Sequence, residues 1–118
     1  MKIVDILDED DLYRRVISLW IKDNGKPSSA AFQNTSGTND MSVDLDRLTT
    51  PELTASVQEG CGVASFPAEL ARINKQKVLH TPIPENCAHS SVIGKKTNSI
   101  RKKMAQGSII IYFPRENH

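Results

Sequence analysis

The segment from His80 to Ser91 gathers the side chains most able to do chemistry. It holds two histidines, a thiol, a carboxylate, an amide and two hydroxyls near its end. It follows an apolar stretch at 77–81 that predicts a strand, and functional side chains concentrate in loops that a rigid strand positions. We therefore take His80, Cys87 and His89 as candidate residues of a functional loop.

Two kinds of chemistry fit this loop. A histidine could activate Cys87 or Ser90 as a nucleophile, although the side chains of His89 and Ser90, as neighbours, should point apart. Zinc accepts His80, Cys87 and His89, with Cys61 as a fourth ligand, but the spacing matches no known pattern. We predict no metal and no cofactor. A loop that bonds its own backbone explains the same residues, so the sequence leaves enzymatic activity undecided.

A basic region follows the loop. Hydroxyls, Gly94, two lysines and a helix that should begin near Thr97 could together hold an anion. Five bases within nine residues also suit a phosphate backbone, although aromatic side chains for base stacking are missing. A solvated helix face accounts for the same bases. The predicted phosphate- or nucleic-acid-binding residues are His89, Ser90, Lys95, Lys96, Arg101, Lys102 and Lys103.

The charges are unevenly distributed. Residues 1–60 carry 11 acids and 6 bases, whereas residues 61–118 carry 3 acids and 9 bases. The two halves could pair with each other, or one end could present an anion-binding face. Four consecutive acids, Asp8 to Asp11, should cap a helix; docking onto a basic partner is the alternative.

Composition sets the broad class. The chain has 118 residues, 38% of them hydrophobic and 25% charged, with a net charge of +1. These figures fit one domain over residues 1–118. The longest apolar run, 109–113, is too short to span a bilayer, and the first residues lack a signal-peptide pattern. We expect a cytoplasmic protein that does not interact with membranes, in which Cys61 and Cys87 are thiols.

The elements that position these residues follow from hydrophobic periodicity. Strands are predicted at 41–45, 63–66, 77–81 and 109–113, the last of them central in its sheet because it does not alternate. Helices should begin at Thr50, near Ser65 or Phe66, and at Thr97. Residues 85–94 are predicted to form an irregular loop.

Residues 12–21 are ambiguous. The stripe of Leu12, Val16, Leu19 and Trp20 slightly favours a helix, whereas β-branched and aromatic residues favour a strand. If the strand forms, one of the consecutive arginines Arg14–Arg15 faces inward. A buried arginine needs a carboxylate partner or an anionic ligand.

We predict an α+β fold, a single small domain with a mixed sheet of short strands and two to four short helices. The leading functional hypothesis is a small binding or regulatory protein that acts through a macromolecular partner, either another protein or a second copy of itself. The alternatives are a nucleic-acid or nucleotide binder that uses the basic region 89–103, and an enzyme centred on the His80–Ser91 loop. An enzyme should bring His80, Cys87 or His89 together with a distant acid or arginine.

Overall fold

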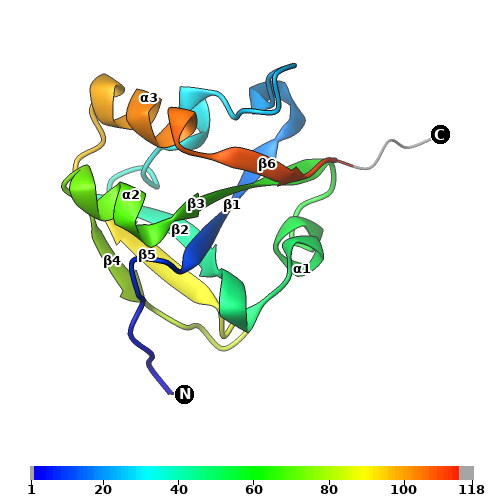
Figure 1. Cartoon of the computed structure of the whole chain (residues 1–118). Helices are drawn as coiled ribbons and strands as arrows, with labels where there is room; N and C mark the ends of the chain where they lie inside the picture. Colours follow the sequence, from blue (N-terminus) through cyan, green and yellow to red (C-terminus); the bar gives the residue numbers. More distant parts are fainter. Residues whose placement is uncertain (1, 115–118) are drawn as a thin grey trace.

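The structure, a computed structural model, describes residues 2–114 and contains one six-stranded sheet with three α-helices. The strand order is β4-β5-β2-β1-β3-β6. The strands are β1 (Asp11–Ile17), β2 (Asp40–Leu45), β3 (Cys61–Pro67), β4 (Lys77–His80), β5 (His89–Ile93) and β6 (Ile109–Tyr112). The helices are α1 (Pro51–Ser56), α2 (Ala68–Ile73) and α3 (Asn98–Gln106) (Figure 1). The α+β class is confirmed. No helix in this part of the chain has the length and apolarity to cross a membrane.

The prediction of a mixed sheet was wrong, because all five strand pairs are antiparallel. Alternating strands and helices suggest crossovers between parallel neighbours. Here β1 instead lies between β2 and β3, both of which run opposite to it.

Residues 11–17 form strand β1, so the helix favoured for this stretch was also wrong. The strand pairs with β3 along its whole length, from Asp11 opposite Pro67 to Ile17 opposite Cys61. This pairing satisfies the backbone and buries Leu12 and Val16 on one face. Leu19 would lie on the buried stripe of a helix, yet it is 84% exposed.

Two further predictions were wrong. Residues 109–113 were expected in the centre of the sheet, but β6 is an edge strand beside β3, and Ile109 and Phe113 are exposed. Residues 85–94 were expected to be irregular, but β5 lies between β4 and β2. Its pattern was hidden because Ser90 and Ser91 occupy buried positions that are usually apolar.

The two faces of the sheet differ. Strand partners share a face, so Leu12, Leu45 and Phe66 lie together with Val92 in the core. Helices α2 and α3 cover this core face, and the rings of Phe32 and Phe66 meet edge to face at 5.8 Å. We call the opposite face, which carries Tyr13, Arg15, Ser42, Asp44 and His89, the polar face.

The two central strands of the sheet, β1 and β2, are paired with each other only at one end. β1 and β2 share two residue pairs, Leu12 with Leu45 and Tyr13 with Asp44. Beyond these two pairs, β1 is paired only with β3, and β2 is paired only with β5, as far as Asp40. The strands therefore separate between residues 14–17 and residues 40–43. We call this separation the split.

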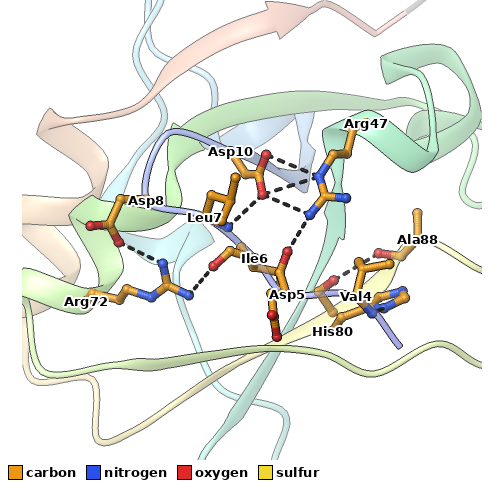
Figure 2. A network of polar contacts seen from close by, with 11 residues as sticks. Val4, Asp5, Ile6, Leu7, Asp8, Asp10, Arg47, Arg72, His80 and Ala88 are labelled. Carbon is orange, nitrogen blue, oxygen red and sulfur yellow. Dashed lines mark hydrogen bonds and ion pairs between the residues drawn. The ribbon is translucent and has the colours of Figure 1, made fainter. Parts of the chain in front are cut away.

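The segment before β1 is held by side chains from distant elements (Figure 2). Arg72 bonds Asp8 at 2.7 Å and the carbonyl of Ile6 at 2.6 Å. Arg47 pairs with Asp10 at 3.3 Å. The amide of Val4 donates to His80. The acids at 8 and 10 therefore bind arginines of this chain, and the helix that they were expected to cap does not form; residues 8 and 9 form a turn.

Candidate functional site

A cleft of about 790 Å³ opens on the polar face of the sheet. Volumes of about 300–1,000 Å³ are typical of sites for small molecules. Residues from β1, β2, β5, α1 and the loop before β5 line it. Its polar lining includes Tyr13, Arg15, Ser42, Asp44, Asn86 and His89.

His89 lies at the start of β5, opposite Asp44 of β2. Its Nδ1 is 2.8 Å from the carbonyl oxygen of Thr81, which can only accept a hydrogen bond, so we assign the ring proton to Nδ1. Its Nε2 is 3.2 Å from Oγ of Ser42. In the neutral ring Nε2 is then the acceptor, and the exposed Ser42 hydroxyl donates to it.

The Thr81 hydroxyl extends this contact into a chain of side chains. Thr81 Oγ1 is 3.1 Å from His89 Nδ1 and 2.8 Å from Oγ of Ser91. Ser91 in turn donates to Asp40 at 3.0 Å. Because hydrogen bonds hold the His89 ring at both Nδ1 and Nε2, they fix its orientation.

Asp44 shapes the wall of the cleft. Its buried carboxylate accepts hydrogen bonds from Thr54 of α1 at 2.7 Å and from Asn86 of the preceding loop at 2.8 Å. Each oxygen thus accepts one hydrogen bond, and Asp44 holds α1 and the loop in place. The N-cap that places Thr54 is as predicted, because Thr50 accepts a hydrogen bond from the amide of Leu53.

The second histidine is used differently. His80 is 6% exposed and faces the core side of the sheet, opposite Ser90. The Val4 amide donates to Nδ1 at 3.0 Å, so the ring proton is on Nε2, which donates to the carbonyl of Cys87 at 2.7 Å. Both nitrogens are occupied by backbone groups. His80 and His89 therefore do not converge, and within residues 2–114 no group of three metal-ligating side chains assembles.

The two cysteines are free thiols, as expected. Cys87 is exposed at the cleft, with Sγ 3.8 Å from the carbonyl of Leu48. Cys61 is buried in the cleft wall, where burial raises the pKa of its thiol and Arg15 opposes that change. Ser90 is fully buried and donates to Ala88, away from His89.

The basic residues do not surround His89. Lys95 and Lys96 follow the far end of β5, and Lys96 donates to Asn34 and to the carbonyls of Val92 and Gly94. Lys102 and Lys103 are exposed on α3, whereas Arg101 is partly buried and bonds Asn98. Whether these bases bind phosphate remains a prediction, but they form no joint lining with His89.

Sequence reasoning missed Ser42 and Asp44 as members of the site. Both lie in a strand that was correctly predicted from its alternation, at its polar positions. A polar face on a strand of a largely buried sheet is the signal that would have found them. Comparison with protein-family models, with curated proteins and with solved structures found no match for this chain.

Proposed function

We propose that the chain is an enzyme in which Ser42 is a nucleophile and His89 its general base. The observation that supports the proposal is the placement of the His89 ring. Nδ1 lies 2.8 Å from the carbonyl oxygen of Thr81, and Nε2 lies 3.2 Å from the Ser42 hydroxyl in an open cleft. A nucleophile, a base and a group that orients the base are the three elements of such a site. His89 also shares the cleft with distant arginines and an acid, the arrangement expected of an enzyme.

The reaction that fits this geometry is acyl transfer from a small ester or thioester. Ser42 Oγ forms a bond to the carbonyl carbon while its proton passes to Nε2 of His89. The imidazolium then gives that proton to the departing alcohol or thiol, and an acyl-serine remains. Water, deprotonated by the same nitrogen, releases the acid and restores the serine. The Thr81 carbonyl stabilises the imidazolium by accepting from Nδ1–H.

The test uses 4-nitrophenyl acetate, a small neutral ester, with intact-mass measurement and peptide mapping. We expect one acetyl group on Ser42 and none on Ser42→Ala. Ser99→Ala, which removes an exposed hydroxyl of α3, is the matched control and should label like the wild type. Acetylation spread over lysines, with none on Ser42, would overturn the proposal.

The tautomers can be read independently of any substrate. Long-range ¹H–¹⁵N spectra of the histidine rings should show His89 protonated at Nδ1 and His80 protonated at Nε2. A proton on Nε2 of neutral His89 would leave Ser42 without a base and would contradict the mechanism.

Partner binding is a second candidate function. It is favoured by the apolar side chains of Leu53 and Val57, which are 60% and 68% exposed on and just after α1 at the edge of the cleft. Sedimentation of the wild type and of Leu53→Ser with Val57→Ser tests self-association. A monomer at all concentrations would remove the homo-oligomer hypothesis.

Nucleic-acid binding by the basic region also stays a prediction. Lys95, Lys102 and Lys103 are exposed and available for phosphate contacts. Affinity for a labelled RNA should fall steeply between low and high salt if these contacts form, and should be unaffected by His89→Ala.

A further inference from the structure

Arg14 occupies the split between β1 and β2. Its backbone is paired with that of Ala64 in β3, on the core face of the sheet. Its guanidinium donates hydrogen bonds to three backbone carbonyl groups. Nε donates to Ala31 at 2.9 Å, Nη1 to Ser42 at 2.8 Å, and Nη2 to Gln33 at 3.4 Å. The arginine thus closes the split and lies directly against the strand that carries the proposed nucleophile.

This guanidinium forms no ion pair with a carboxylate among residues 2–114. The two salt bridges found there belong to Arg47 and Arg72. Burial, together with the nearby charge of Arg15, lowers the pKa of Arg14 to about 10. A buried charge is normally paired, because desolvation is costly unless an opposite charge offsets it. A buried arginine is paired with a carboxylate or an anionic ligand, and no carboxylate among the described residues lies within ion-pair distance of Arg14.

The surroundings of Arg14 are positive. The pKa of Lys96 is lowered to about 8, mainly by burial. The nearby charge of Arg14 lowers this pKa as well, while the charge of Asp40 raises it. Arg15 lines the cleft on the neighbouring strand position. Three cations therefore act on this region. The acid among them, Asp40, accepts a hydrogen bond from Ser91 at Oδ2, and its buried Oδ1 has no hydrogen-bond partner among the described residues.

A guanidinium has five N–H groups, and the carbonyls of Ala31, Ser42 and Gln33 take one each. The remaining N–H groups are on Nη1 and Nη2, the two atoms that form the fork recognised by anionic oxygens. Arg14 also belongs to the lining of the cleft. We propose that Arg14 binds an anionic oxygen group, carboxylate or phosphate, of the molecule that occupies the cleft. This inference rests on the proposed function, which it narrows to acyl compounds that carry such a group.

The first experiment observes Arg14 directly in the wild-type chain. Its side-chain Nε–Hε signal is followed by NMR while inorganic phosphate, acetate or chloride is added at matched ionic strength. We expect a saturable shift with phosphate or acetate and none with chloride. A response to phosphate alone identifies a phosphate-bearing ligand, and a response to acetate identifies a carboxylate. No shift, or the same shift with chloride, would overturn the inference.

The second experiment uses variants. Arg14→Gln should weaken binding of the active anion at least about tenfold, or about 1.4 kcal/mol. Arg47→Gln, which removes an arginine already paired with Asp10, is the matched control and should bind like the wild type. Unchanged affinity in Arg14→Gln would show that the anion binds elsewhere. If that variant does not fold, the wild-type titration still decides.

The two proposals fail separately. Anion binding should survive in His89→Ala, since the ring of His89 does not contact Arg14. Acetylation of Ser42 by the neutral ester is measured on the wild type without added anion, so that it does not require the Arg14 site to be filled. Loss of labelling with intact anion binding overturns only the enzyme, and the reverse result overturns only the anion site.

Discussion

The two histidines, His80 and His89, end and begin adjacent strands, and the sheet separates their roles. His80 faces the core and gives both ring nitrogens to backbone groups, those of Val4 and Cys87. His89 faces the cleft and keeps one nitrogen for the hydroxyl of Ser42. Alternation along paired strands is enough to place one histidine in the core and the other in the cleft. Residue type and sequence proximity alone cannot distinguish them.

The largest expected effect separates the two by reactivity. His89→Ala should slow acetylation of Ser42 by about a hundredfold, because general-base assistance contributes about that much or more. The free energy of unfolding should change little, since the ring is partly exposed. Release of 4-nitrophenol in the first turnover measures the rate. An unchanged rate would make His89 as structural as His80.

The free energy of unfolding should depend more on His80 than on His89. His80→Ala should lower the free energy of unfolding by about 2–3 kcal/mol, because it leaves a buried cavity and two unpaired backbone groups. Urea unfolding measures this loss. Lys77→Ala, an exposed position on the same strand, is the control. A loss no greater than that of the control would show that the core histidine is dispensable.

Loss of the hydrogen bond between Thr54 and Asp44 in the wall of the cleft should have a smaller effect on stability. Thr54→Val should cost about 1–2 kcal/mol, because one oxygen of the buried Asp44 carboxylate loses its donor. Ser56→Ala, an exposed change on the same helix, should cost less. Equal stability of Thr54→Val and the wild type in urea would show that α1 does not depend on Asp44.

The smallest effect concerns Lys96 and pH. Its pKa is lowered in the folded chain from 10.5 to about 8, so between these values the unfolded chain holds a proton that the folded chain has released. Stability from this residue therefore rises with pH across that interval. The stability of the wild type relative to Lys96→Met should increase from pH 8 to pH 10.5, by an amount limited because the lysine is partly exposed. A flat difference in thermal midpoint would contradict it.

Local signals in the sequence located most elements. Thr50 and Thr97 cap α1 and α3 as predicted, and the strands near 41–45 and 77–81 form where alternation and β-branched residues placed them. What failed depended on tertiary pairing. The stretch from Leu12 to Ile17 became a strand because β3 pairs along all of it, and β6 became an edge because nothing lies beyond it in the sheet of the described chain.

The sequence identified only part of the candidate site. His89 stood out by type, and the sequence showed that an inward arginine would need an anion or a carboxylate. Ser42 and Asp44 come from a strand more than forty residues earlier, and their proximity to His89 depends on the register of β2 with β5. Register is set by long-range packing, so no spacing in the sequence could bring these residues together.

The segment that precedes β1 has a consequence for the order of folding. Its anchors lie far along the chain: Val4 is separated from His80 by 76 positions, Ile6 from Arg72 by 66, and Asp10 from Arg47 by 37. Contacts of such large separation form late, because closing long loops must precede them. During synthesis, residues 4–10 are made before Arg47, Arg72 and His80. We therefore expect the part of this domain that is made earliest to dock last, completing the structure only after the strand that contains His80 has joined the sheet.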